Sequence, residues 1–283
     1  MNNMSITQIG ENGDNNAFFP SAGGGKICTG KNGKTFVVYA TTSGTTVTMS
    51  YDGHKWSNGQ ALPLSRPYMA VDSDGFVHIA GLGEEGVWYF QSQEPNSIDK
   101  FSDGEKIYPP NYSALAISEE DTLYYFGSRL PAGAFLKKPK GGKWSQPCTV
   151  VNGGIYPGIA CHGSSIHVIY CGWNHIPALY EGVYYMKSED GGKTWQKSDG
   201  TPLKLPVQHG SGQEELLSLT QNTGGGESNT HNLCIMVDNE GKTHVLYWYS
   251  RPYFIAFGTA SGGSPEATTD AIWCGTASRA GCR

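Results

Sequence analysis

Short apolar segments alternate with polar turns along most of this sequence. An apolar strand, a turn rich in Asp, Glu, Gly or Ser, and a second apolar strand recur five times, which is the pattern of antiparallel β-hairpins. No long stretch carries apolar residues at helical spacing, and Gly or Pro interrupts the chain every few residues,. The pattern therefore predicts an all-β fold. The five turns are expected near residues 31–33, 72–75, 119–121, 163–165 and 238–241.

The spacing of the hairpins narrows the architecture. The first four follow one another at intervals of roughly 40–50 residues, the length of one blade of a β-propeller. Segments 86–91, 182–187 and 194–197 supply outer strands. We expect a propeller of four-stranded antiparallel blades, five of them recognisable, with six or seven blades or an incomplete ring as alternatives. The domain prediction is a propeller over 1–257, a large loop over 199–229 and a disordered low-complexity tail over 258–283.

Composition and charge exclude several classes of protein. With 38% hydrophobic residues and 39 glycines, the 283 residues suit one all-β domain,. The net charge of −5 argues against nucleic acid or an anionic membrane as partner,. No apolar segment approaches the roughly 20 residues that span a bilayer, and the polar segment 1–16 predicts no export signal. Seven scattered cysteines form no C-x-x-C pair, so neither a zinc ribbon nor a disulfide framework is expected.

One turn carries a recognisable motif. Residues 188–195 read Ser-Glu-Asp-Gly-Gly-Lys-Thr-Trp, a polar turn in which two glycines tolerate positive φ and a tryptophan can fold back beneath. The segment resembles the Asp-box of sialidase-type β-propellers, and weaker copies occur at 50–56 and 140–144. The resemblance implies the fold rather than the activity, because such propellers include hydrolases, lyases and non-catalytic binding proteins.

Polar and aromatic residues gather at one end of the predicted hairpins. In an antiparallel meander, the segments that precede the first strand and follow the second share one face, and three of the five arginines (66, 129 and 251) fall there. This face is the expected binding site for an anionic polysaccharide or glycan. The candidate substrate-binding residues are Tyr68, Tyr156, Trp173, His231 and Arg251.

A narrower resemblance begins at residue 112. The segments 112–129, 143–144, 155–157, 188–203 and 237–245, together with His167 and Trp173, resemble the BNR-4 type of propeller. That family includes ulvan lyases, which cleave uronate-containing algal polysaccharide by β-elimination. The resemblance covers about half of the chain and implies that Tyr112 is a catalytic tyrosine and Arg129 a carboxylate-neutralising arginine. It departs at Asn174, where an arginine often stands, and the family's upstream catalytic histidine has only His54 or His78 as candidates.

The chemistry of β-elimination asks for the same residue types. Abstraction of the C5 proton of a uronate requires that its carboxylate be neutralised, which a bidentate arginine does well. A Tyr or His then acts as base, and a group must protonate the departing O4. The predicted catalytic residues are Tyr112, Arg129 and His175. The reaction needs no cofactor, and no metal site is predicted, since His231, Cys234 and His244 match no standard zinc spacing.

Two other functions are compatible with the sequence. An exo-sialidase-type hydrolase would need an arginine triad, but the early Arg-Ile-Pro motif is absent, with Phe-Phe-Pro at 18–20 the nearest sequence. A non-catalytic glycan-binding propeller would use the same face without turnover. The tyrosines could be packing residues and the arginines solvated, and equivalent positions within strands favour structural roles for His78, His167 and His244. We expect a monomer, extracellular or periplasmic on account of the proposed substrate.

Overall fold

The computed structural model describes residues 6, 8–11, 13, 26–50, 55–129, 132–175, 178–219, 230–249 and 273–274. Every regular element among them is a strand, which confirms the predicted all-β class. None of these residues lies in a helix, so the described part of the chain holds no helix that could cross a membrane. The chain divides into two compact units. The first comprises residues 1–20, 24–124 and 137–145, and the second residues 21–23, 125–136 and 146–283.

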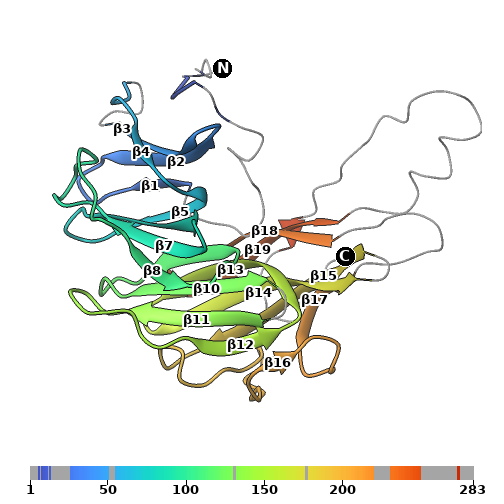
Figure 1. Ribbon diagram of the computed structural model, residues 1–283. Helices are drawn as coiled ribbons and strands as arrows, with labels where there is room; N and C mark the ends of the chain where they lie inside the picture. Colours follow the sequence, from blue (N-terminus) through green and yellow to red (C-terminus); the bar gives the residue numbers. More distant parts are fainter. Residues whose placement is uncertain are drawn as a thin grey trace, which may run out of the picture. The chain divides into compact units, whose positions relative to one another are not determined.

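Two four-stranded sheets belong to the first unit (Figure 1). In each, consecutive strands are neighbours and pair antiparallel. Both contain the hairpin predicted for them. The strands are β1 (Ile27–Thr29), β2 (Thr35–Thr41), β3 (Gly44–Ser50) and β4 (Gln60–Leu62), then β5 (Ser65–Val71), β6 (Val77–Gly83), β7 (Gly86–Gln91) and β8 (Glu105–Tyr108).

A third sheet contains one more strand than predicted. Its order is β16-β12-β11-β10-β9, and the extra strand β16 pairs parallel to β12. The core of this sheet is the run Leu123–Ser128, in which every residue is buried. The strands are β9 (Ser113–Ile117), β10 (Leu123–Arg129), β11 (Ala132–Lys138), β12 (Cys148–Asn152) and β16 (Val207–Gln208).

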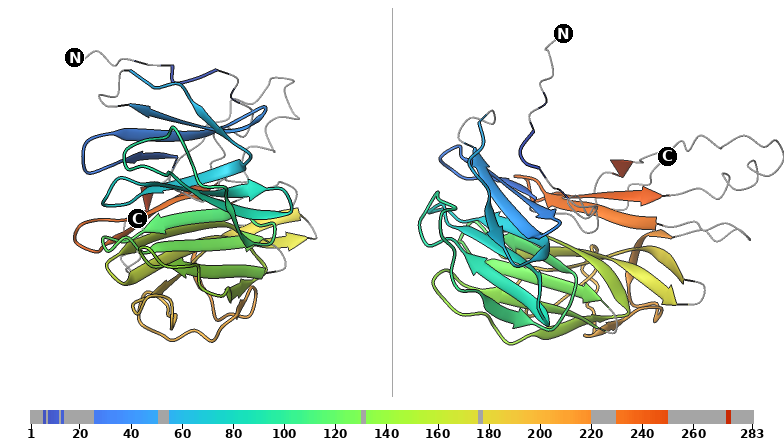
Figure 2. Two further views of the ribbon diagram at one scale, coloured as in Figure 1. Left: turned by 60° about the vertical axis from the view of Figure 1, so that its left-hand side comes forward. Right: turned by 45° about the horizontal axis from the view of Figure 1, so that its top comes forward.

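The last two sheets belong to the second unit. One has the order β13-β14-β15-β17 and the other β18-β19-β20, with antiparallel neighbours in both. Figure 2 gives two further views, in which the strands of this unit run in colour from green to red along the sequence. The strands are β13 (Gly154–His162), β14 (Ser165–His175), β15 (Ala178–Ser188) and β17 (Glu215–Leu219), then β18 (Thr230–Val237), β19 (Thr243–Tyr249) and β20 (Trp273–Cys274).

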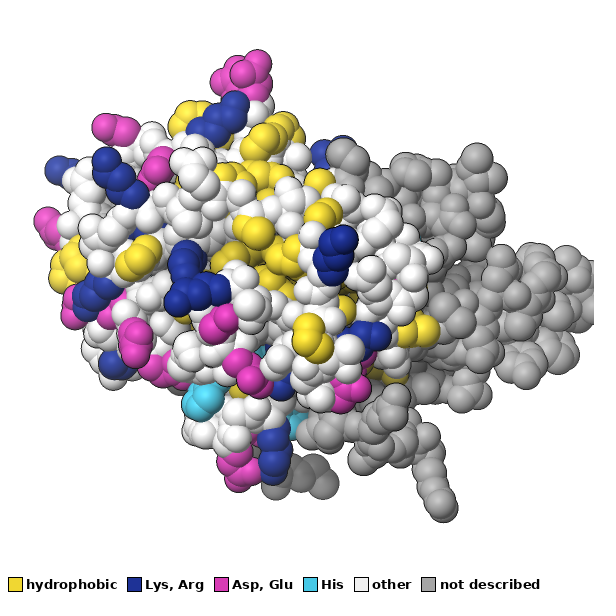
Figure 3. Space-filling model, turned by 90° about the horizontal axis from the view of Figure 1, so that it is seen from below, with side chains coloured by type: hydrophobic (Ala, Val, Ile, Leu, Met, Phe, Trp, Pro, Cys, Tyr) yellow, Lys and Arg dark blue, Asp and Glu magenta, His cyan; other side chains and the backbone are white. Residues whose placement is uncertain are grey.

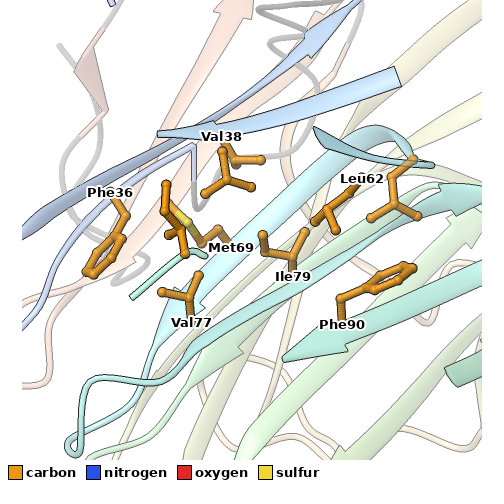
Figure 4. Close-up of a cluster of buried hydrophobic side chains, with 10 residues drawn as sticks. Phe36, Val38, Leu62, Met69, Val77, Ile79 and Phe90 are labelled. Atoms are coloured by element: carbon orange, nitrogen blue, oxygen red, sulfur yellow. The ribbon is translucent and has the colours of Figure 1, made fainter. Parts of the chain in front are cut away.

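The core of the first unit forms because its strands alternate buried and exposed positions. Along β2, Phe36, Val38 and Ala40 are buried while Thr35, Val37 and Tyr39 are partly exposed, so one face of the sheet is apolar. That face packs against the sheet of β5–β8, where Met69 and Ile79 are almost fully buried. Figure 4 shows the side chains of Phe36, Val38, Met69 and Ile79 directed toward one another between the two sheets. Burial of this apolar area is what holds the two sheets together.

The turn at 188–195 has the small core that its sequence predicts. The Asp190 carboxylate accepts hydrogen bonds from the backbone N–H groups of Lys193 and Thr194, both at 2.9 Å, and from the Thr194 hydroxyl at 2.7 Å. These bonds hold the pKa of Asp190 well below its usual range,. Trp195 is 2% exposed and meets the Phe135 ring edge to face, with ring centroids 5.4 Å apart,. The carboxylate closes the turn and the indole anchors it.

Two predictions about this part of the chain are wrong, an outer strand at residues 194–197 and a large loop over residues 199–229. Residues 194–197 form no strand, because only Gln196 bridges to Lys187 and Pro202. The fourth strand of that sheet is β17, which together with β16 lies within the segment predicted as a large loop. Of the predicted tail, residues 258–283, Trp273 and Cys274 form β20 beside β19. The rest of that prediction lies outside the described residues.

Histidines in the second strands of three hairpins are hydrogen-bonded, as their equivalent positions predict. His78 contacts the Tyr89 hydroxyl at 2.7 Å and the Asp72 carboxylate at 3.1 Å. His167 contacts the Tyr185 hydroxyl at 2.7 Å and the Thr243 hydroxyl at 2.9 Å, and His244 contacts the Asp238 carboxylate at 2.8 Å. These contacts satisfy ring nitrogens that would otherwise be costly to bury.

The Asp190 turn can be tested by substitution. Asp190→Ala removes the acceptor for four donors of the turn, the Lys193 and Thr194 N–H groups and the Ser188 and Thr194 hydroxyls, so we expect the free energy of unfolding to fall by about 1–2 kcal/mol. Glu189→Ala is the matched control, because this exposed carboxylate pairs with Lys187 at the surface and does not close the turn, and we expect a change within about 0.5 kcal/mol. Urea unfolding measures both. Equal losses in the two variants would show that Asp190 does not hold the turn.

The buried His167 predicts a loss of stability in acid. Burial lowers the pKa of its ring to about 4, below the value of about 6.5 in an unfolded chain. The unfolded state therefore binds the proton first as the pH falls, and the contribution of neutral His167 is complete above about pH 6.5 and lost toward about pH 4. His167→Asn keeps a polar group near Nδ1 but cannot titrate. We expect it to reduce the stability difference between about pH 7.5 and about pH 4.5 by about 2 kcal/mol.

Urea unfolding at the two pH values measures this difference. His162→Asn is the control, because His162 is exposed on the same sheet. An unchanged pH dependence in His167→Asn would contradict the assignment of the acid sensitivity to this residue.

Candidate functional site

The first strands of two hairpins begin with the same distortion. In β5 the register shifts between Ser65 and Tyr68, and in β13 it shifts between Ile155 and Gly158. At each shift a residue precedes a proline and has positive φ, 50° at Arg66 and 57° at Tyr156. Left-handed backbone is uncommon for residues other than glycine, and a following proline favours extended backbone instead. Such positions cost about 1–3 kcal/mol each and concentrate at functional sites.

The bulge in β5 brings Arg66 to Tyr112. The Cζ atom of Arg66 lies 4.4 Å from the centroid of the Tyr112 ring, in the geometry of a cation–π contact. Tyr112 directly precedes β9 and is half-buried, as is Arg66. Residues that begin two successive hairpins thus place a permanent cation against a phenol. We call Lys26, Arg66, Tyr68 and Tyr112 the Arg66 site.

Lys26 and Tyr68 complete the Arg66 site. Tyr68 is 4% exposed, and burial raises its pKa while the nearby charge of Arg66 opposes that rise,. The Lys26 ammonium lies 5.1 Å from the centroid of the Tyr68 ring and donates a hydrogen bond to the Pro67 carbonyl oxygen at 2.6 Å. The site therefore combines two cations with two aromatic rings, a combination that suits an anionic sugar.

The opposite ends of β1, β5 and β9, where these strands lead into their turns, carry acidic side chains. A cavity of about 270 Å³ lies among the turns that follow β1, β5 and β9. Burial alone would raise the pKa of Asp72 and Asp121, but hydrogen bonds from His78 and Phe76 N–H to Asp72, and from Lys140 and Ser73 to Asp121, hold both pKa values below their usual range. Both carboxylates are therefore ionised at neutral pH, so this cavity repels an anionic ligand. The lining residues are Thr29, Gly30, Lys31, Val71, Asp72, Ser73, Ser118, Glu119 and Asp121.

Surface charge is mixed elsewhere. On the face shown in Figure 3, Lys and Arg side chains of the described residues are interspersed with Asp and Glu. Binding of an anionic glycan would therefore depend on a few cations at the site rather than on a broad basic surface.

The remaining predicted site residues fall in the second unit or outside the description. Arg129 ends β10 and is exposed, and Tyr156 is half-buried in the bulge of β13. Trp173 and His175 lie in β14 and His231 lies in β18, with only their backbone described. Arg251 lies outside the described residues, as does His54. His78, the other candidate for an upstream catalytic histidine, is buried and bonded through both ring nitrogens.

The second unit holds a further buried group of polar side chains. The His209 ring meets Tyr184 edge to face, with centroids 5.0 Å apart, and its Nδ1 lies 3.3 Å from the buried Glu214 carboxylate. Gly172 and Gly153 leave the space that the His209 ring fills. Glu214 in turn accepts hydrogen bonds from backbone N–H groups of Gly210 and Gly212. The group fastens the segment after β16 to the sheet.

Sequence reasoning placed Arg66 on the binding face but did not single it out, and it missed Lys26. Pro67, just before the predicted strand, is the available signal for Arg66, because proline in a sheet is confined to edges and bulges. No local pattern marks Lys26, whose partner is 41 residues away.

Comparisons with known proteins agree with this fold. Residues 138–260 match the family model BNR_4, described as "BNR repeat-containing family member". No curated protein matches the chain. A solved structure of a PL25 ulvan lyase bound to -[GlcA(1-4)Rha3S]- is similar with a TM-score of 0.63 and 19% identity, over 83% of this chain and 68% of the lyase.

Two further solved structures show the same likeness. The polysaccharide lyase Uly1 has a TM-score of 0.54 and 14% identity over 81% of this chain and 67% of its own. The Bacillus subtilis arabinanase Arb43A has a TM-score of 0.50 and 10% identity over 81% of this chain and 90% of its own. At these identities the likeness concerns the fold. The resemblance to BNR-type propellers drawn from the sequence is confirmed for residues 138–260, and the chain shares the propeller fold of the ulvan lyase structure.

Proposed function

We propose that the protein binds a uronate-containing polysaccharide at the face of the Arg66 site and cleaves it by β-elimination. The observation that carries the proposal is the Arg66 guanidinium held 4.4 Å from the centre of the Tyr112 ring. In this contact, Arg66 is a cation that can bind a carboxylate, and Tyr112 is a candidate for the proton transfer. The similarity in fold to a PL25 ulvan lyase with bound -[GlcA(1-4)Rha3S]- supports the same substrate class.

The reaction can be written with the chain's own residues. Arginine neutralises the uronate carboxylate, so that negative charge can build on it as C5 loses its proton. Tyr112 as phenolate, or His175 as neutral imidazole, takes the C5 proton; the electron pair of the C5–H bond forms the C4–C5 double bond, and the bond between C4 and O4 breaks with its electron pair leaving on O4. The departing O4 receives a proton from Tyr112 or from His175. Arg129 is the arginine that the resemblance assigns to the carboxylate, and Arg66 is a second cation for the same anionic chain.

The other predicted residues serve binding in this proposal. Tyr156 offers a half-buried ring in the bulge of β13, whereas Tyr68 is buried in β5 and contributes through its contact with Lys26. Trp173, His231 and Arg251 are the further binding residues that the sequence predicts. Aromatic rings stack on the apolar faces of sugars while cations hold acidic groups. The partner is an anionic polysaccharide, and no cofactor is required.

A non-catalytic glycan-binding propeller is the second candidate. It is favoured by Asn174, which stands where related lyases often carry an arginine. Loss of that cation would weaken stabilisation of the transition state more than binding of the ground state. The two candidates differ only in turnover.

An assay for the unsaturated product decides between them. Wild-type protein is incubated with a panel of uronate polysaccharides, including ulvan, and the ultraviolet absorbance of the unsaturated uronyl product is followed. We expect a rise with at least one polymer, and a loss of about 100-fold or more in rate for both Tyr112→Phe and Arg129→Ala.

Tyr108→Phe is the matched control, because Tyr108 lies in β8 and has no part in the proposed reaction. Circular dichroism checks that each variant is folded. No rise on any polymer, with glycan binding retained, would contradict the lyase and favour the binding propeller. A rise that survives both substitutions would show that Tyr112 and Arg129 are not the catalytic pair.

A further inference from the structure

Lys26 touches the distorted backbone that carries Arg66. The residue directly precedes β1, and its ammonium donates a hydrogen bond to the Pro67 carbonyl oxygen at 2.6 Å. The same nitrogen lies 5.1 Å from the centre of the Tyr68 ring. Lys26 therefore contacts both residues that follow Arg66 in the chain.

The Pro67 carbonyl belongs to the bulge of β5. The register of β5 against β6 shifts between Ser65 and Tyr68, so Arg66 and Pro67 are the residues displaced from the regular ladder. Arg66 has φ of 50° there, a backbone conformation that persists only where the surroundings hold it. A charged hydrogen bond to the adjacent carbonyl is one such restraint.

We propose that Lys26 is a positioning residue for the Arg66 site: by holding the Pro67 carbonyl and covering Tyr68, it keeps the bulge that directs Arg66 onto Tyr112. The ligand class is an anionic oxygen group of an acidic sugar, a carboxylate or a sulfate ester. The identity of that ligand rests on the proposed function, but the link from Lys26 to Arg66 does not.

The surroundings of Lys26 make this restraint sensitive to alkaline pH. Burial lowers the pKa of the Lys26 amine to about 8. The titratable group in contact with it is Tyr68 of β5; Arg66 lies two residues before Tyr68 in the same strand, and Cys28 lies two residues after Lys26 in β1. Burial raises the pKa of Tyr68, and it raises that of the Cys28 thiol to about 11, so both remain neutral while Lys26 titrates. As the pH rises through about 8, Lys26 loses its charge and its bond to Pro67 weakens.

Nuclear magnetic resonance can follow Arg66 directly. The chain has only five arginines (66, 129, 251, 279 and 283), so selective ¹³C-arginine labelling gives a small set of Cδ–Hδ signals, and Arg66→Lys identifies the one from Arg66. The Tyr112 ring shifts that signal, and Tyr112→Leu gives its value without the ring. We expect Lys26→Met to move the Arg66 signal most of the way to the Tyr112→Leu value and Lys26→Arg to restore it in large part.

Lys34→Met is the matched control, because Lys34 also donates to a backbone carbonyl in the first unit, that of Asn96, at 2.8 Å. We expect it to leave the Arg66 signal unchanged. In wild-type protein the Arg66 signal should move with a midpoint near pH 8. An Arg66 signal that stays at its wild-type position in folded Lys26→Met overturns the proposal. If that variant does not fold, a wild-type signal that is constant across this pH range overturns it.

Kinetics separate this proposal from the lyase itself. With an active lyase, we expect Lys26→Met to raise KM by roughly tenfold and to change kcat by less than about twofold, because a positioning residue for ground-state binding alters KM. A roughly tenfold fall in kcat with an unchanged KM in Lys26→Met would overturn the positioning role. If the wild-type protein cleaves no polymer, the proposed function fails while the Arg66 signal still decides the role of Lys26.

Discussion

The candidate site depends on one local constraint, the bulge that Pro67 imposes on the first strand of a hairpin. In a regular strand, successive side chains point to opposite faces of the sheet, and that of residue 66 would point to one of these faces. The register shift and the positive φ instead turn Arg66 onto the ring of Tyr112. The same device recurs at Tyr156 and Pro157 in β13. Strain of this kind needs a rigid support, which the buried sheets of the first unit provide,.

The two ends of these strands have opposite electrostatic character. Where the strands of the first unit begin, Lys26 and Arg66 present positive charge beside two phenol rings. Where they end, Asp72 and Asp121 are kept ionised by hydrogen bonds from His78, Lys140 and Ser73. An acidic protein can therefore still attract an acidic polysaccharide at one end, because local charge rather than net charge governs the encounter.

Sequence reasoning predicted the hairpins well, because each pairs a short apolar run with a turn whose Asp or Gly has a clear conformational role. The turn at 188–195 and the hydrogen-bonded His78 and His167 were found in the same way. It failed where structure depends on distant partners. β16 and β17 lie in a polar segment that becomes strand only by pairing with β12 and β15. Lys26 was missed for the same reason, since nothing near it in the sequence indicates its bond to Pro67.

The most direct test of the site is a crystal structure of Tyr112→Phe with a bound uronate oligosaccharide. The substitution blocks the proposed proton transfer while leaving the ring against which Arg66 lies, so an intact ligand should accumulate. We expect a uronate carboxylate or a sulfate within hydrogen-bond distance of the Arg66 guanidinium, and the scissile bond beside residue 112. An oligosaccharide that binds elsewhere, with no acidic group near Arg66, would contradict the assignment of this face as the site.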